Sequence, residues 1–195
     1  MKFLAALAAG YLIGSIPFGL ILARTKGIDI RKHGSGNIGA TNVWRTVGPA
    51  YGAAVLVLDA LKGSAAVILG RMSGVEGGEL LTGLAALLGH AFPLYIGFKG
   101  GKIMATGAGV MLTLSPLPTV SAMAVFAVVV FISRYVSLGS IIAAAALPFL
   151  LAAFHYNGKY LVFGILFCVF AILKHIPNIK RLLTGTESRF NFKRG

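Results

Sequence analysis

Residues 3–23 read FLAALAAGYLIGSIPFGLILA, an apolar run without a charged side chain. A helix needs about 20 apolar residues to cross the hydrocarbon core of a bilayer, so this stretch predicts a membrane-spanning helix. The run is longer than the apolar part of a usual signal peptide and basic residues follow it, which favours a retained first span. The whole chain is 57% hydrophobic and only 12% charged, unlike a soluble domain. Lipid is therefore its expected solvent.

Six further apolar segments predict an all-α, polytopic integral membrane protein with about seven transmembrane helices. They cover residues 52–70, 79–98, 103–115, 119–133, 138–154 and 160–173. Segments 103–115 and 119–133 are separated by only a short Ser/Pro-rich link, so they either both span or form a re-entrant pair. We expect residues 1–195 to form a single membrane-embedded domain.

Basic residues are distributed unevenly between the two sets of connections. Fourteen of the eighteen Lys and Arg residues lie in the connections 24–51, 99–102, 134–137 and 174–195. Short loops rich in Lys and Arg stay in the cytoplasm, which predicts a cytoplasmic C-terminus and an N-terminus outside. The net charge of +13 would suggest nucleic-acid binding in a soluble protein. Between apolar spans, however, it favours membrane lipids or anionic substrates and no nucleic acid.

The first basic connection carries the sequence GSGNIGATN at residues 34–42, with Arg45 shortly after it. Glycine alternates there with short hydrogen-bonding side chains, which lets backbone N–H groups and hydroxyls close around an oxyanion. Arg45 can hold a phosphate through two parallel hydrogen bonds. A flexible Gly/Ser/Asn loop explains the composition alone equally well.

The second basic connection reads FKGGK at residues 98–102. Two lysines flank a Gly-Gly pair where one predicted span ends and the next begins, so backbone amides, a helix N-terminus and ammonium groups can converge on an anion. The structural alternative is a basic turn whose lysines reach lipid headgroups.

The third basic segment, KHIPNIKRLLTGTE at residues 174–187, begins where the last predicted span ends. His175, Asn178 and Arg181 are three residues apart and would share one face of an uninterrupted helix, although Pro177 lies among them. A positively charged membrane anchor explains the basic residues, but it gives no reason for His175 or Asn178.

Several polar residues lie within or beside the predicted spans. Asp59 and Lys62 are three apart and are expected to pair along one helix face, in a structural or a functional role. Ser137 and Ser140 are expected either to expose their hydroxyls at the start of the sixth span or to bond back to that helix. His90, close to a proline, is interpreted as a structural histidine.

In this order, and on one side of the membrane, the three motifs resemble those of the bacterial acyl-phosphate-dependent glycerol-3-phosphate acyltransferases. The matching segments are 35–42 with Arg45, 89–102, and 175–187. The resemblance implies a seven-helix enzyme of the bacterial inner membrane whose active site faces the cytoplasm. It implies transfer of a fatty acyl group from acyl phosphate to the 1-hydroxyl of sn-glycerol 3-phosphate, giving lysophosphatidic acid and phosphate for phospholipid synthesis. An acyl-phosphate-forming enzyme would act upstream.

The same resemblance implies the roles of individual residues. Ser35, Lys102 and His175 are the catalytic candidates. The expected substrate- and phosphate-binding residues are Ser35, Gly36, Asn37, Thr41, Asn42, Arg45, Lys99, Gly100, Gly101, Lys102, Ser140, His175 and Asn178.

One position departs from the family pattern. The family usually reads KGGKGVAT where this chain has KGGKIMAT at residues 99–106. If the family glycine has a positive φ, Ile103 strains the turn and activity is weakened or specialised. If that glycine serves only helix packing, Ile103 faces lipid.

The sequence favours direct attack by the glycerol hydroxyl. It contains neither a GxSxG motif nor a convincing carboxylate dyad, and its single cysteine, Cys168, lies within an apolar run. We expect the substrate's own phosphate, or else His175, to accept the proton, and we expect no metal or cofactor. An anion transporter is the main alternative, although it requires access from both faces. A non-catalytic lipid-binding scaffold leaves the motifs without a use.

Overall fold

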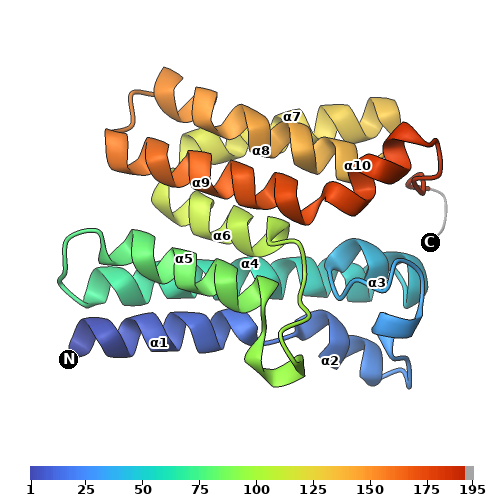
Figure 1. Ribbon diagram of the computed structural model, residues 1–195, viewed down its shortest axis with the longest axis horizontal. Coiled ribbons are helices and arrows are strands. Elements are labelled where there is room, and N and C mark those ends of the chain that lie inside the picture. The colour runs from blue at the N-terminus through green and yellow to red at the C-terminus, as the bar shows by residue number, and fades with distance from the viewer. Residues whose placement is uncertain (192–195) are drawn as a thin grey trace. The chain divides into compact units, whose positions relative to one another are not determined.

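The computed structural model describes residues 1–191, and this range is built of helices without a β-strand (Figure 1). The all-α prediction is therefore confirmed. By its internal contacts the chain divides into two compact units, Met1–Leu114 and the segment from Ser115 onward. Whether the two units behave as the single domain expected from the sequence stays a prediction.

The first unit contains six α-helices and two short 3-10 helices. These are α1 (Lys2–Ser15), α2 (Phe18–Arg24), η1 (Ile30–Lys32), α3 (Ala40–Thr46), α4 (Pro49–Met72), α5 (Gly78–Ala91), η2 (Leu94–Ile96) and α6 (Met104–Leu114). Helix α1 packs on α4 and α5, and α6 packs on α4 (Figure 1). Glycines permit the close approach of α4 and α6, because a Cβ at Gly63 or Gly109 would overlap the backbone of the facing helix.

The first apolar run is broken at Ile16 and Pro17, which the sequence analysis did not anticipate. Pro17 has no N–H to continue the helical ladder, and the backbone of Ile16 is extended (φ −60°, ψ 116°). The carbonyl of Ile16 instead accepts a hydrogen bond from Lys62 Nζ at 2.8 Å. The break lets α2 leave the path of α1 while remaining attached to α4.

The second unit contains α7 (Pro116–Ser133), α8 (Val136–Ala153), α9 (Gly158–Lys174) and α10 (Ile176–Leu183). Helix α8 packs on both α7 and α9. Helices α9 and α10 meet at an angle of 57°. Pro177 lies in the first turn of α10, where a missing N–H is tolerated, so this proline starts a new helix.

The helices occur where the seven spans were predicted, but they are not all long enough to cross a bilayer. Five candidate spans meet the criteria of length and hydropathy: Lys2–Arg24, Pro49–Met72, Gly78–Ile96, Pro116–Ser133 and Val136–Ala153. The bent pair α9 and α10 makes a sixth if it counts as one span. Helix α6 has 11 residues, or about 16 Å of rise, against a core about 30 Å thick. The count of seven and the orientation of the termini stay predictions.

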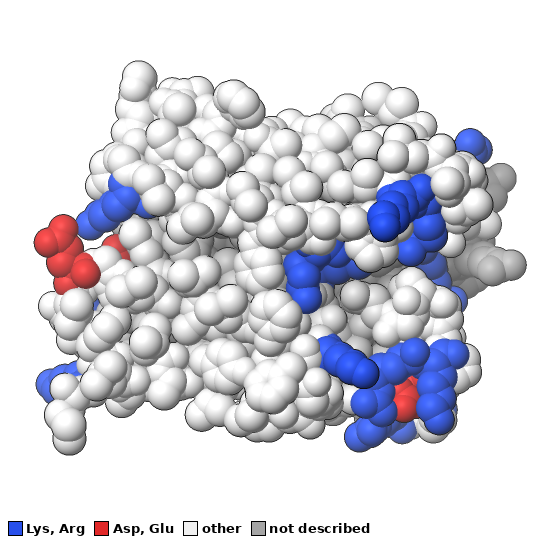
Figure 2. Space-filling view, viewed as in Figure 1, with Lys and Arg blue, Asp and Glu red and all other residues white. Residues whose placement is uncertain are grey.

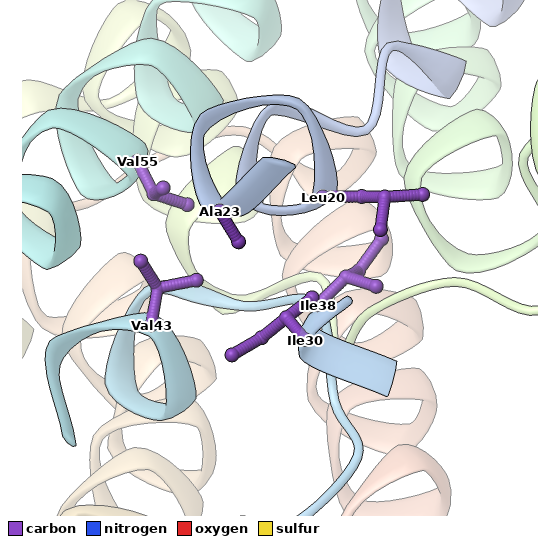
Figure 3. Packing of buried hydrophobic residues seen from close by; sticks show 6 residues of the cluster. All are labelled: Leu20, Ala23, Ile30, Ile38, Val43 and Val55. Atoms are coloured by element: carbon purple, nitrogen blue, oxygen red, sulfur yellow. The ribbon is translucent and has the colours of Figure 1, made fainter. Parts of the chain in front are cut away.

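A small core holds the first basic connection against α2 and α4 (Figure 3). Its buried members are Leu20, Ala23, Ile30, Ile38, Val43 and Val55. Gly19 lets α2 approach the motif closely, since a Cβ there would overlap the carbonyl oxygen of Ile38. The connection 24–51 thus contains η1 and α3 and has its own apolar core.

Candidate active site

Asn42 organises the glycine-rich motif of the first unit, which we call the first loop (residues 30–42). Its side chain is 4% exposed and extends from α3 into the loop. Its Oδ1 accepts a hydrogen bond from Ser35 N at 3.0 Å, while Nδ2 donates to the carbonyls of His33 (3.0 Å), Asn37 (2.9 Å) and Ile30 (3.4 Å). One amide therefore ties four points of the loop together.

Left-handed glycines give the first loop its tight path. Gly34 and Gly36 have φ values of +59° and +70°, a region that side chains with a Cβ rarely adopt. At Gly34 a Cβ would also overlap Asn42 Oδ1. Ser35 in this turn and Arg45 on α3 are both exposed, as a role in binding an anion requires.

The second loop (residues 97–103) folds back onto the end of α5. Gly101 N donates to the carbonyl of His90 at 3.0 Å. A Cβ at Gly100 would overlap that same carbonyl, and a Cβ at Gly101 would overlap the His90 ring. The Gly-Gly pair is thus required by close approach to His90, and Lys99 is exposed beside it.

Ile103 is the position at which this chain departs from the family pattern, and it adopts the left-handed conformation with φ +61°. This conformation is an outlier for a β-branched residue and is expected to be strained. The side chain is completely buried, so the alternative in which Ile103 faces lipid is wrong. Its carbonyl accepts a hydrogen bond from Gly107 N at 2.6 Å, at the start of α6.

Three ionisable side chains are buried together in the first unit. The predicted pairing of Asp59 and Lys62 is confirmed, with Oδ1 and Nζ 2.7 Å apart. His90 joins them, because its Nδ1 lies 3.7 Å from the same carboxylate oxygen. All three side chains are at most 4% exposed. The sequence could not reveal this contact, since His90 belongs to another helix and no spacing rule connects it with α4.

The predicted site residues of the second unit lie at the break between α9 and α10 and at the start of α8. His175 separates the two helices, so the uninterrupted helix through Asn178 does not form. His175 Nδ1 lies 2.8 Å from the carbonyl of Ala171. A carbonyl only accepts, so Nδ1 carries the hydrogen and the neutral ring has its lone pair on Nε2. His175, Asn178 and Ser140 are at most 5% exposed.

Glu187, which is not among the predicted site residues, connects α8 and α10. Its Oε1 accepts hydrogen bonds from Ser137 Oγ and Asn178 Nδ2, both at 2.7 Å, and its Oε2 accepts from Arg181 Nε at 2.6 Å. Burial alone would raise the pKa of Glu187, but these hydrogen bonds outweigh it and lower the pKa. The carboxylate is therefore ionised and fixes the orientation of the Asn178 amide.

Of the two alternatives expected for the serines at the start of α8, exposure of their hydroxyls is wrong. Ser137 and Ser140 are 6% and 5% exposed, respectively. Ser137 donates to Glu187, so back-bonding to its own helix is also wrong for this residue. The hydrogen-bond partner of the Ser137 hydroxyl is thus a residue distant in sequence, which local spacing could not predict.

Basic side chains gather around an acidic group at the end of the first unit that carries α2 and η1 (Figure 2). Asp29 accepts from Arg31 Nε and Nη2 at 2.9 and 2.7 Å. The hydrogen bond from the Arg31 side chain lowers the pKa of Asp29 below its ordinary range. The carboxylate also accepts from Arg31 N and so starts η1, with which the first loop begins.

The structure brings some of the predicted residues of each unit into contact. In the first unit, Asn42 contacts both Ser35 and Asn37, while the glycines of the second loop lie on His90. In the second unit, Asn178 lies next to the break at His175, whose carbonyl accepts from Asn178 N at 2.8 Å. Among the described residues, no group of three or more His, Cys, Asp or Glu side chains has the geometry to hold a metal ion.

Comparison of the sequence with known proteins gives one consistent result. A family model described as Glycerol-3-phosphate acyltransferase matches residues 4–185. The glycerol-3-phosphate acyltransferase of Desulforudis audaxviator is 53% identical over 185 residues, which cover 94% of this chain and 93% of the relative. That of Geobacter sulfurreducens is 50% identical over 184 residues, with coverages of 94% and 95%.

Two solved structures share the fold over nearly the whole chain. Both are crystal structures of PlsY (YgiH), an integral membrane glycerol 3-phosphate acyltransferase. The glycerol 3-phosphate form is 41% identical with a TM-score of 0.93, and the lysophosphatidic acid form is 40% identical with a TM-score of 0.91. Each comparison covers 98% of this chain and 96% of the other. This chain therefore belongs to the glycerol-3-phosphate acyltransferase family of integral membrane enzymes.

Proposed function

We propose that this protein transfers a fatty acyl group from acyl phosphate to the 1-hydroxyl of sn-glycerol 3-phosphate. The products are lysophosphatidic acid and inorganic phosphate. The observation that carries the proposal is the construction of the first loop, whose buried Asn42 fixes the backbone around His33, Ser35 and Asn37 in one tight turn shortly before Arg45 in the chain. Such a turn suits a phosphate group, and both proposed substrates contain one.

The second loop supports the same chemistry with a different set of donors. Lys99 and Lys102 flank two glycines at the start of α6, where helix N–H groups and ammonium groups favour an anion. Two phosphate-bearing substrates repel one another, so bringing them together requires positive charge on the protein. Arginine and lysine therefore serve binding and approach rather than covalent chemistry.

The proposed reaction is a direct acyl transfer. An acyl phosphate is a mixed anhydride, so its carbonyl carbon is activated and phosphate is a good leaving group. The C1 hydroxyl oxygen attacks this carbon, a C–O ester bond forms, and the carbon–oxygen bond to phosphate breaks with its electron pair leaving on phosphate. Residues of the site contribute mainly by holding the hydroxyl and the carbonyl within reach of each other.

The proton of the hydroxyl passes to a substrate phosphate oxygen in this proposal. His175 is the alternative acceptor, supported by its hydrogen bond to Ala171, which leaves the lone pair of the neutral ring on Nε2. Ser35, Ser140 and Asn178 are proposed as further phosphate ligands. Glu187 fixes the Asn178 amide by accepting one of its two N–H bonds, and the other N–H is the group that we propose donates to a phosphate oxygen.

The donor is tested directly with the purified protein in detergent. Acyl phosphate, acyl-CoA and acyl carrier protein of one chain length are each supplied with glycerol 3-phosphate, and lysophosphatidic acid and phosphate are measured together. We expect equimolar products with acyl phosphate only. Product formation from acyl-CoA at a comparable rate would refute the choice of donor, whereas no product from any donor would refute the enzyme function itself.

We place the enzyme in the bacterial inner membrane with both loops facing the cytoplasm. The support is the concentration of Lys and Arg in the connections that carry the motifs. An enzyme that forms acyl phosphate would supply the donor from that side. Membership of an acyltransferase family favours this reading over the anion transporter that the basic loops alone also allow.

A further inference from the structure

The buried cluster of Asp59, Lys62 and His90 has no part in the reaction proposed above. Charged groups within a membrane span are expensive to bury, and they persist where they have a structural or functional task. The two charges on α4 compensate each other, because Lys62 Nζ lies 2.7 Å from Asp59 Oδ1. Each of its members nevertheless reaches a second element of the first unit. These additional contacts require an explanation.

We propose that Asp59, Lys62 and His90 form a positioning cluster that fixes both phosphate loops of the first unit to α4. This inference rests on the proposed function, since it assigns a task to residues that do not touch the substrates. It makes the three side chains determinants of substrate affinity that act through the loops. The two loops then share one buried support.

His90 links α4 to the second loop. Asp59 Oδ1 lies 3.7 Å from His90 Nδ1 on one side of the ring. Gly101 lies against the ring so closely that a Cβ there would overlap it. The carbonyl of His90 also accepts from Gly101 N at 3.0 Å. A displacement of the ring therefore moves the Gly-Gly turn and the lysine next to it.

Lys62 links α4 to the first loop. Its ammonium group donates to the carbonyl of Ile16 at 2.8 Å and lies 5.6 Å from the centre of the Phe18 ring. These contacts hold the break at which α2 begins. Helix α2 in turn brings Gly19 against the carbonyl of Ile38, a residue of the first loop. Lys62 thus supports the first loop through α2.

The charges make the support rigid in a way that apolar packing would not. A buried ion pair has fixed distances and directions, and loss of one partner leaves an uncompensated charge that must move or attract water. Replacing Asp59 by Asn therefore disturbs both connections at once. A purely structural ion pair, by contrast, would affect the stability of α4 without altering the affinity for a phosphate.

The decisive experiment is a double-mutant cycle between His90 and Gly101, with KM for each substrate and kcat measured separately. In the wild-type background, Gly101→Ala forces an overlap with the ring, and we expect KM for a phosphate substrate to rise about tenfold or more, with kcat changing less than about twofold. His90→Ala alone should raise the same KM by about fivefold to tenfold. In the His90→Ala background, Gly101→Ala should add less than about twofold.

Ser64→Ala is the matched control. Ser64 lies on α4, two residues from Lys62, and donates to the carbonyl of Gly109 at 3.0 Å without touching the cluster. We expect this variant to lose thermal stability in detergent but to keep both KM values. Independent effects of the two mutations in the cycle would overturn the proposal. A loss of stability in His90→Ala with unchanged KM would do the same.

Limited trypsin digestion measures how readily the second loop opens and does not depend on acyltransferase activity. Cleavage after Lys99 or Lys102 requires the loop to open, so its rate reports how firmly the loop is held. We expect His90→Ala and Asp59→Asn to be cut there at least about fivefold faster than wild type and Ser64→Ala. Unchanged cleavage would refute the positioning role, even if the protein had no acyltransferase activity. If the wild-type protein is inactive but the variants are cleaved faster, only the proposed function is refuted.

Discussion

The backbone strain at Ile103 can be measured by comparing two substitutions at this one position. Ile103→Ala and Ile103→Gly both remove a completely buried side chain, so both should destabilise the protein by about 2–5 kcal/mol. They differ only in the Cβ. At an ordinary backbone position the glycine variant is less stable than the alanine variant by about 0.5–1 kcal/mol. At φ +61° the order should reverse.

The size of the reversal follows from the left-handed conformation. A residue with a Cβ loses about 1–2 kcal/mol there, whereas glycine is not penalised. Subtracting the greater backbone entropy of unfolded glycine leaves Ile103→Gly more stable than Ile103→Ala by about 0.5–1 kcal/mol. For a protein of this length the difference corresponds to a melting temperature about 1–4 °C higher.

Thermal unfolding of both variants in one detergent is the assay, and Val110 provides the control. Val110 is also completely buried, but it lies within α6 at ordinary helical angles. There the alanine variant should be more stable than the glycine variant by about 1 kcal/mol. If alanine is also the more stable substitution at Ile103, the turn is not strained and the reasoning fails.

Four further outcomes test the two units. Arg45→Ala should raise KM for glycerol 3-phosphate by about 10- to 100-fold, because a charged hydrogen-bonded pair is lost, and Arg45→Lys should have an intermediate KM. An unchanged KM in Arg45→Ala would remove Arg45 from the site. Asn42→Ala should lower the free energy of unfolding by about 2–4 kcal/mol, and a loss below about 1 kcal/mol would contradict its role in the first loop. His175→Ala should raise a KM while kcat stays within about tenfold of wild type, whereas a fall of about 100-fold or more would make His175 the obligatory base. Because the folded-state pKa of Glu187 lies below its ordinary value of 4.5, its contribution to stability is present above about pH 5 and is lost as the pH falls through the lowered pKa. Melting temperatures should therefore fall further in wild type than in Glu187→Gln between about pH 7 and pH 3, and parallel curves would count against this.

The positions of the long helices could be predicted because long apolar runs have few alternatives in lipid. Each of the seven predicted segments contains a helix, although the segment 3–23 is divided between α1 and α2 and α5 ends at Ala91, before the predicted bound of 98. The pairing of Asp59 and Lys62 was equally accessible, since helical spacing alone brings the two side chains together. Short helices such as α3 were not predicted, because seven residues contain too few turns for a hydrophobic period to be recognised.

The contacts that shape the candidate site could not be read from the sequence. Glu187 meets Ser137 across a separation of 50 residues, and Lys62 meets Ile16 across 46. Such partners depend on how helices pack, which local spacing does not encode. The glycine-rich motif showed that a tight turn was needed, but only the fold shows that Asn42 is the side chain around which it closes.

Because a single amide holds the first loop at four points, the loop has few partly open states. Releasing Asn42 frees the segments around Ser35, His33 and Asn37 together, so the loop should open as one cooperative unit, and exchange of the Ser35 amide proton should report that opening. A ligand that meets this loop finds its backbone already ordered, so little conformational entropy is lost on binding. Preorganisation of this kind allows a small anion to be bound firmly although it offers little surface to contact.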